Sequence, residues 1–186
     1  MALTDSNSLT KNYHGKFGHG VYRTLGDFTI LQKLPDFSHV RWSKAQRAVR
    51  KRFAGATGYA KASMADPERR RFYEKKARHM QSAWNMAISD YMLNPEIGKI
   101  DLLEYHGKKG DVINVEAYDK YSVAAVLVFI YNAVGQEVES GLAVSLPWEH
   151  IWIYEAREDN PLWQGGKIVI RVCDSPGNVV TASLAV

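Results

Sequence analysis

The hydrophobic pattern of this chain changes its period at Asn94-Pro95, and this change constrains the fold more than any other feature. Before it, apolar side chains recur at alternating steps of four and three residues, at Tyr73, Ala77, Met80, Trp84, Ala87 and Tyr91. That spacing forms one apolar face of a helix. After it, short runs of β-branched and aromatic residues alternate with turn clusters such as KKGD and DSPGN. The pattern therefore predicts an α+β protein with a helical part followed by a β part.

Two helices are predicted in the first part. Ser43 is a favourable N-cap for the first helix, in which Val49 and Phe53 lie at helical spacing. Asp66-Pro67 begins the second helix, with a cap residue followed by proline at the first helical position. This helix is expected to continue to Asn94, because a residue that precedes proline is pushed out of the α region. We interpret its apolar face as core packing.

A glycine-rich segment precedes the helices, with the sequence NYHGKFGHGVYRTLGDFTI at residues 12–30. Its runs HGVYRTL and FTILQKL are predicted to form a β-hairpin joined by Gly26-Asp27. The glycines are interpreted as turns and bulges of a twisted two-stranded ribbon. Such a ribbon is only marginally stable in water. It is therefore expected to dock on its own helices or on a neighbouring subunit.

The same segment does not have the pattern of a phosphate loop or a zinc site. Lys16 is followed by neither a hydroxyl residue nor a helix, both of which a Walker loop requires. His14 and His19 lack two further ligands at convergent positions. We therefore predict no metal at this segment.

The β part, residues 97–186, contains seven runs of strand-forming residues separated by turns. This spacing is typical of an immunoglobulin-like (Ig-like) antiparallel β-sandwich. The predicted domains are a basic ribbon with a helical hairpin at residues 1–96 and the sandwich at residues 97–186. Cys173 is expected to be buried, because it lies in the apolar run KIVIRVCD.

Two spaced motifs carry a resemblance to a known group of proteins. One is a Gly-Lys-x-Gly ribbon at Gly15, Lys16 and Gly18, and the other is a helix with Ser43, Gln46, Arg50 and Phe53. With these motifs, and with AYDKYSVAAVLVFIYNAVGQEVESGLAV and CDSPGN in the β part, the chain resembles an uncharacterised bacterial family that ends in an Ig-like module. The resemblance covers most of the chain and implies an architecture. It implies no functional residue, since the family has no assigned activity.

The charge is divided along the chain. Residues 11–80 contain 17 basic and 5 acidic residues, a net charge of +12, whereas residues 81–186 contain 7 basic and 14 acidic residues, a net charge of −7. An uneven charge distribution of this kind bears on which partners the protein binds and says little about its fold. The basic residues expected to contact an acidic partner or a nucleic acid are Lys16, Arg23, Arg47, Arg50, Lys51, Arg69, Arg70, Arg71, Lys75 and Arg78.

These features favour a non-enzymatic structural protein that assembles with itself, its basic half docking on an acidic surface of a neighbouring subunit. The residues expected to take part in assembly are Gly15, Gly18, Val21, Tyr22, Phe28 and Ile30. The alternative is a protein that binds the backbone of DNA or RNA through the basic helices.

No catalytic residue, cofactor or small-molecule substrate is predicted, because no nucleophile lies beside a base. Glu137 and Glu139 are interpreted as solvated surface. Four loop residues could either bind calcium or form turns, and turn formation is the favoured interpretation: Asp119, Asp159, Asp174 and Asn178. We therefore predict no metal. A polar start, a single cysteine and the lack of an apolar run of about 20 residues predict a cytoplasmic protein without a membrane span, although release or a surface location stays open.

Overall fold

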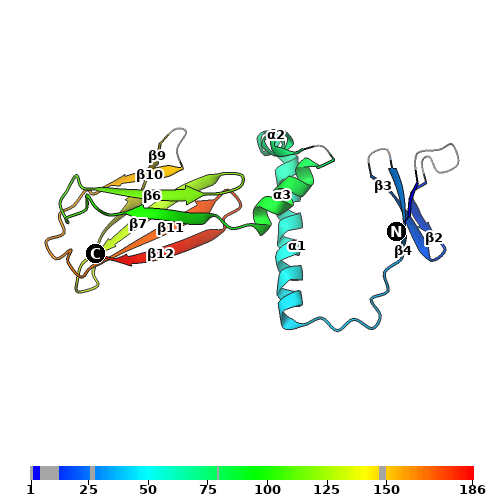
Figure 1. Ribbon diagram of the computed structural model, residues 1–186, viewed down its shortest axis with the longest axis horizontal. Coiled ribbons are helices and arrows are strands. Elements are labelled where there is room, and N and C mark those ends of the chain that lie inside the picture. Colours follow the sequence, from blue (N-terminus) through cyan, green and yellow to red (C-terminus); the bar gives the residue numbers. More distant parts are fainter. Residues whose placement is uncertain (1, 5–12, 26–27, 79, 147–149) are drawn as a thin grey trace.

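The computed structural model describes residues 2–4, 13–25, 28–78, 80–146 and 150–186, and within them it contains three helices and three antiparallel sheets. Figure 1 shows the N-terminal sheet, the helices and the other two sheets following one another along the long axis. The predicted α+β class is confirmed.

The N-terminal sheet has the strand order β1-β4-β3-β2. Its strands are β1 (Ala2–Thr4), β2 (Gly15–Phe17), β3 (Gly20–Leu25) and β4 (Phe28–Lys33). Strands β3 and β4 form the predicted hairpin, with Leu25 opposite Phe28, while the connecting residues 26 and 27 lie outside the described residues. The prediction of a two-stranded ribbon was wrong, because β1 pairs with β4 and β2 with β3. Both added strands are three residues long, too short to give a periodic pattern.

The helices are α1 (Lys44–Ala65), α2 (Pro67–Lys76) and α3 (Ala83–Met92). Ser43 and Gln46 form a capping box at the start of α1, and Asp66 caps α2, both as predicted from their residue types. The predicted continuous helix from Asp66 to Asn94 was wrong. It is interrupted after Lys76, Met80 adopts a φ of 64°, and the Ser82 side chain accepts the Asn85 N–H to cap a new helix.

The three helices share a small core. Ala60, Tyr73, Met86 and Ala87 are buried in it together with Tyr121, which comes from the β part. Packing is therefore confirmed as the role of the predicted apolar face at Tyr73 and Ala87. Met80 is exposed because it lies in the interruption between α2 and α3.

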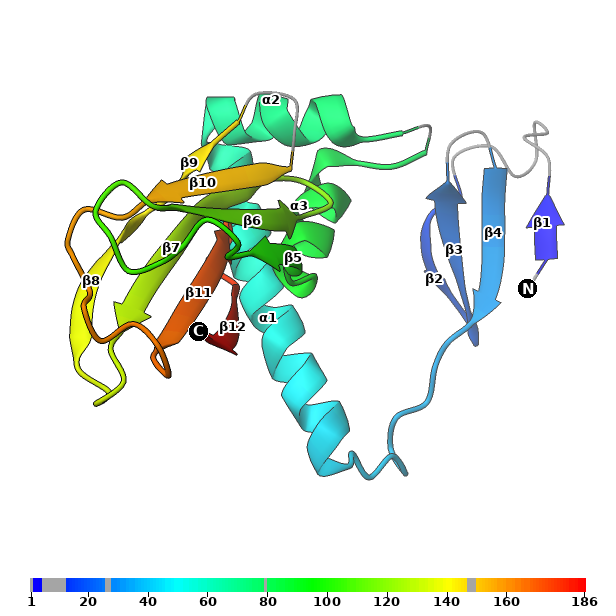
Figure 2. The ribbon, with the colours of Figure 1, turned by 60° about the vertical axis from the view of Figure 1, so that its left-hand side comes forward.

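The β part consists of two four-stranded sheets, with strand orders β5-β6-β10-β9 and β12-β11-β7-β8. The strands are β5 (Glu96–Asp101), β6 (Val112–Tyr118), β7 (Val123–Tyr131), β8 (Glu137–Leu142), β9 (Val144–Ser145), β10 (Ile151–Glu155), β11 (Lys167–Asp174) and β12 (Val179–Ala185). The inner faces of β6, β7, β10 and β11 supply one common hydrophobic core, so the sheets pack face to face (Figure 2).

The prediction of seven strands was wrong by one among the described residues of this part. The run at 136–146 was read as one strand but forms both β8 and β9, which belong to different sheets. Between them Ala143 is buried and donates its N–H to the Val126 carbonyl. A chain that changes sheets within one apolar run leaves no turn signal in the sequence.

The prediction that Cys173 is buried was also wrong. In β11 the side chains of Ile168, Ile170 and Val172 lie in the core, and Cys173 lies on the opposite face, where it is half-buried. An apolar run that covers both faces of a strand hides the alternation that decides which residue is buried.

Helix α1 offers a test of its packing through two glycines. An added Cβ at Gly58 would meet nothing within 4 Å, so Gly58→Ala should stabilise the protein by about 0.5–1 kcal/mol through helix propensity. At Gly55 an added Cβ would lie 2.7 Å from the Tyr91 hydroxyl of α3. Gly55→Ala should therefore gain less than Gly58→Ala when both are measured by urea unfolding. Equal gains would contradict the close approach of α1 and α3.

Candidate functional site

Tyr121 joins the β part to the helical core. It lies in the loop between β6 and β7, its ring is 6.1 Å from that of Tyr73, and its hydroxyl donates to the Met86 sulfur at 3.7 Å. Asp119 holds this loop in place, since its Oδ1 accepts the N–H groups of Tyr121 at 2.7 Å and Ser122 at 2.9 Å. The loop is thus an ordered turn that inserts an aromatic side chain between the helices.

Asn178, in the turn between β11 and β12, makes a second connection. Its side-chain amide donates to the carbonyl oxygens of Leu93 at 2.8 Å and Tyr91 at 3.2 Å, both at the end of α3. Arg52 of α1 donates to the Asn178 Oδ1 at 3.3 Å. Asp174 shapes the turn, because its Oδ1 accepts the N–H groups of Gly177 and Asn178. One asparagine therefore connects the turn to two helices.

Asp90 of α3 lies at the centre of this junction and is 1% exposed. Its Oδ2 accepts the Tyr73 hydroxyl at 2.6 Å, and the hydroxyls of Tyr73 and Tyr59 lie 2.8 Å apart. The pKa of Asp90 is raised to about 6, chiefly by burial, while the Tyr73 hydrogen bond lowers it and the neighbouring charges of Asp119 and Asp174 act in the same direction as burial. Burial also raises the pKa of Tyr73 above its usual range.

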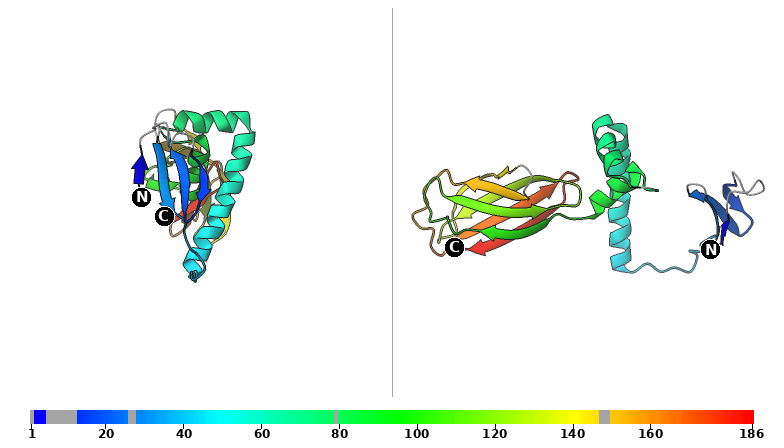
Figure 3. Two further views of the ribbon diagram at one scale, coloured as in Figure 1. Left: turned by 90° about the vertical axis from the view of Figure 1, so that its right-hand side faces the viewer. Right: turned by 45° about the horizontal axis from the view of Figure 1, so that its top comes forward.

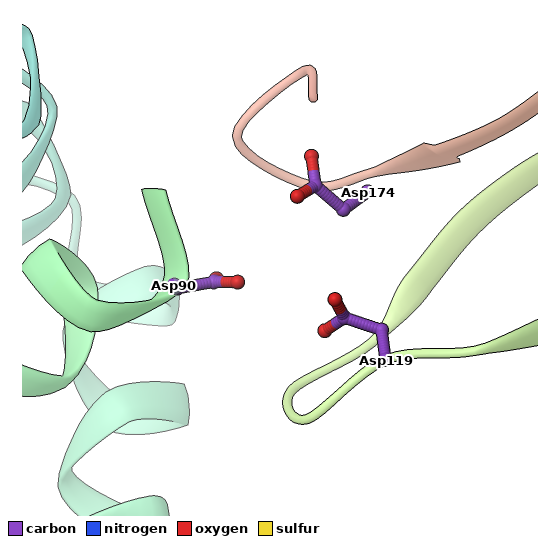
Figure 4. Close-up of side chains that lie close together, drawn as sticks. All are labelled: Asp90, Asp119 and Asp174. Atoms are coloured by element: carbon purple, nitrogen blue, oxygen red, sulfur yellow. The ribbon is translucent and has the colours of Figure 1, made fainter. Parts of the chain in front are cut away.

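Asp90, Asp119 and Asp174 come together from three separate segments of the chain. One carboxylate oxygen of each lies within 4.8 Å of the other two. Figure 4 shows the three side chains facing a common gap, Asp90 from helix α3, Asp119 from the loop between β6 and β7, and Asp174 from the end of β11. Among the described residues this is the acidic group with the spacing of a metal site, and it contains no histidine.

Two of these three aspartates, Asp119 and Asp174, are among the four loop residues for which the sequence leaves calcium binding as the alternative to turn formation. Asp159 does not join them, since its Oδ1 accepts the Lys109 N–H elsewhere in the β part. Asn178 lies near the three aspartates, and its side-chain amide donates to the carbonyl oxygens of Tyr91 and Leu93. Asp90 was missed, although an aspartate three residues after Ala87, on the apolar side of a predicted helix, was a usable signal.

The predicted basic residues are spread over three elements. Arg47, Arg50 and Lys51 are exposed on the first half of α1, which extends beyond α3 (Figures 1 and 3). On α2, Arg69 pairs with Asp66 at 3.5 Å and Arg70 pairs with Glu74 at 2.9 Å. The others are exposed, with Lys16 and Arg23 on the N-terminal sheet and Arg71, Lys75 and Arg78 on or after α2. The ten residues therefore do not form one patch.

The predicted assembly residues lie on both faces of the N-terminal sheet. Gly15 is opposite Tyr22, and Tyr22 is opposite Leu31. Val21, Phe28 and Ile30 lie on the other face, where Ile30 is buried. Gly15 and Gly18 have φ angles of 95° and 56°, which glycine adopts without strain, as the turn interpretation expected.

One face of this sheet is rich in exposed apolar side chains. We call it the aromatic face and define it as Tyr13, Phe17, Tyr22 and Leu31. Phe17 is 75% exposed. Tyr13 and Phe17 were not among the predicted assembly residues.

A second apolar surface lies where β8, β9 and β10 meet. We call it the edge patch and define it as Leu142, Val144, Leu146 and Ile153, which line one groove. Val144 is 72% exposed. Glu155 and Arg157 line the same groove.

Comparisons of the chain with protein-family models, with curated proteins and with solved structures found no match. The resemblance to an uncharacterised bacterial family therefore stays a prediction. Among the described helices, none has the length and apolar character that crossing a membrane requires.

The junction predicts a large effect for a partly exposed residue. Asn178→Ala should lower the free energy of unfolding by about 1–3 kcal/mol, because it removes the donor to two carbonyl oxygens at the end of α3. The matched control is Asn85→Ala on the exposed side of α3, which should change stability little. Urea unfolding followed by circular dichroism measures both, and similar values for the two variants would contradict the role of Asn178.

Proposed function

We propose that this protein is a non-enzymatic structural module that assembles with copies of itself. The N-terminal sheet and the basic helix α1 of one subunit dock on the acidic β part of the next subunit. In this proposal the β part is an Ig-like module that serves as the receiving surface.

The Ig-like assignment is supported by strand order. The strands β5, β6 and β7 are labelled A, B and C, β8 is labelled C′, and β9 to β12 are labelled D to G. The sheets then read A-B-E-D and G-F-C-C′, the arrangement typical of immunoglobulin-like sandwiches. The antiparallel pairing of every strand pair and the single core between the sheets agree with it.

The observation that carries the assembly proposal is the pair of exposed apolar surfaces, the aromatic face and the edge patch. Soluble proteins rarely expose grouped large apolar side chains unless these side chains bind something. Both surfaces adjoin sheet edges, at β2 and at β9, and an open edge is a template for pairing with another chain. We infer that the aromatic face of one subunit covers the edge patch of another.

Charge supports a second copy as the partner. Exposed Lys33 lies on the aromatic face, within the half of net charge +12, whereas the edge patch, whose groove is lined by both Glu155 and Arg157, lies in the half of net charge −7. Because the two surfaces differ, the contact is head to tail and produces a ring or an open filament. The linker at residues 34–43 can span at most about 33 Å, enough for the sheet to reach a neighbour.

Light scattering of the intact protein tests this proposal. Species larger than a monomer are expected at low salt and should diminish at 1 M salt, where the Debye length is about 3 Å. Val144→Asp and Phe17→Asp should each abolish them without unfolding the protein, because each places a charge in the apolar contact. Leu103→Asp is the matched control, since Leu103 is 81% exposed and lies outside both surfaces. A monomer at every salt concentration, or equal effects of all three variants, would refute the proposal.

Nucleic-acid binding is the second candidate, and one observation favours it. Every residue of α1 from Lys44 to Gly55 is exposed, and Arg47, Arg50 and Lys51 lie on this stretch. The intrahelical ion pairs of Arg69 and Arg70 compete with phosphate contacts on α2. We therefore assign this activity to α1.

A mobility-shift assay with duplex DNA and with RNA at low salt tests the second candidate. Replacing Arg47, Arg50 and Lys51 together by glutamine should weaken binding to all sequences alike and reduce its salt dependence. Lys108→Gln with Lys109→Gln is the control, since both lysines are exposed on the β part. The absence of a shift for the intact protein at micromolar concentration removes this candidate.

A further inference from the structure

We propose that Asp90, Asp119 and Asp174 bind one calcium ion, which links helix α3 to the two loops of the β part that face it. This site is independent of the assembly surfaces and goes beyond the proposed function. It lies inside one subunit, at the junction formed by Tyr121 and Asn178.

The spacing of the carboxylates suits a single ion. Calcium binds oxygen ligands at about 2.3–2.6 Å, so two ligands on opposite sides of it lie up to about 5 Å apart. One oxygen of each aspartate lies within 4.8 Å of the others. A single ion can therefore contact all three side chains without a change of backbone.

The second observation is an unpaired oxygen on a buried side chain. Asp90 is 1% exposed, and its Oδ1 has no hydrogen-bond partner within the described part of the chain. Its Oδ2 is already bonded to Tyr73. Figure 4 shows the Asp90 carboxylate directed into the gap between Asp119 and Asp174. A buried carboxylate oxygen without a partner is costly, and a cation at this position satisfies it.

The other two carboxylates are fixed by their own loops. Oδ1 of Asp119 accepts two backbone N–H groups, and so does Oδ1 of Asp174. Oδ2 of Asp119 receives no hydrogen bond from the described residues. The ligands are thus held in position by local turns, which lowers the entropic cost of binding an ion.

The charge of the cluster also calls for a cation. None of the ion pairs found among the described residues includes Asp90, Asp119 or Asp174. One carboxylate oxygen of each lies within 4.8 Å of the other two, so negative charges on these groups repel one another and a bound cation relieves the repulsion. Asp90 also lies in the last turn of α3, whose carbonyl end attracts positive charge.

The ligand set identifies calcium among the common cations. It contains carboxylate oxygens and neither histidine nor cysteine, the ligands typical of zinc. The three ligands come from separate segments of the chain, and water would complete the shell. Calcium accepts such a shell, whereas magnesium demands a near-ideal octahedron.

Isothermal titration calorimetry of the full-length protein, stripped with EDTA and titrated with calcium chloride, tests the site. One calcium per chain is expected, together with a rise in melting temperature that saturates with calcium. Asp119→Asn should weaken binding at least tenfold while the loop stays intact, because the amide oxygen still accepts the Tyr121 and Ser122 N–H groups. Asp159→Asn, a loop variant outside the cluster, should bind as the parent protein does.

No heat and no shift in melting temperature for the parent protein at about 5 mM calcium, beyond the range of weak natural calcium modules, would overturn the proposal. Equal loss of affinity in Asp119→Asn and Asp159→Asn would also overturn it, as would tighter binding of magnesium than of calcium. If Asp119→Asn fails to fold, terbium luminescence of the parent protein decides. Tyr73 and Tyr121 lie close enough to sensitise a bound terbium ion, and emission that calcium displaces supports the site, whereas its absence overturns it.

Discussion

The hydrogen bonds that connect Tyr59, Tyr73 and Asp90 join one residue from each of the three helices, and the arrangement of the whole junction depends on them. Helices α2 and α3 have 10 residues each, which is below the length at which isolated helices are stable in water. Their stability must therefore come from packing around Tyr73. Tyr73 and Asp90 are buried and Tyr59 is half-buried, so removing one member leaves a buried polar group without its partner, which is costly.

Contacts of two kinds join the helices to the β part. Tyr121 inserts a side chain into the helical core, and Asn178 satisfies carbonyl oxygens at the end of α3. The first contact is mainly the packing of an aromatic ring, whereas the second consists of directional hydrogen bonds. A cation bound by the three aspartates would add a third contact at the same place. The proposed assembly surfaces lie away from this junction, at the edge patch and on the N-terminal sheet, so ion binding and assembly can be measured separately.

Sequence periodicity predicted the order of helices and strands, the caps at Ser43 and Asp66 and the hairpin of β3 and β4. Periodicity gave wrong predictions at two places where an apolar pattern continues through the end of an element. Ser82 starts a new helix inside a continuous apolar pattern, and the 136–146 run changes sheets without a turn. Two of the three aspartates of the cluster, Asp119 and Asp174, could be found from the sequence, because both stand in turn patterns. Their meeting with Asp90 depends on how the helices dock on the sheets, which no local pattern encodes.

The segment between the N-terminal sheet and α1 is more ordered than its lack of helix or strand indicates. The Asp36 side chain accepts the Ser38 N–H, the rings of Phe37 and Trp42 lie 6.2 Å apart, and Arg50 of α1 stacks over Trp42 at 4.2 Å. These contacts shorten the part of the tether that can move freely. A short tether keeps the aromatic face at a high effective concentration near any surface within its reach. The same tether keeps the aromatic face from reaching more distant surfaces. Its length therefore limits which neighbouring surfaces the aromatic face can contact.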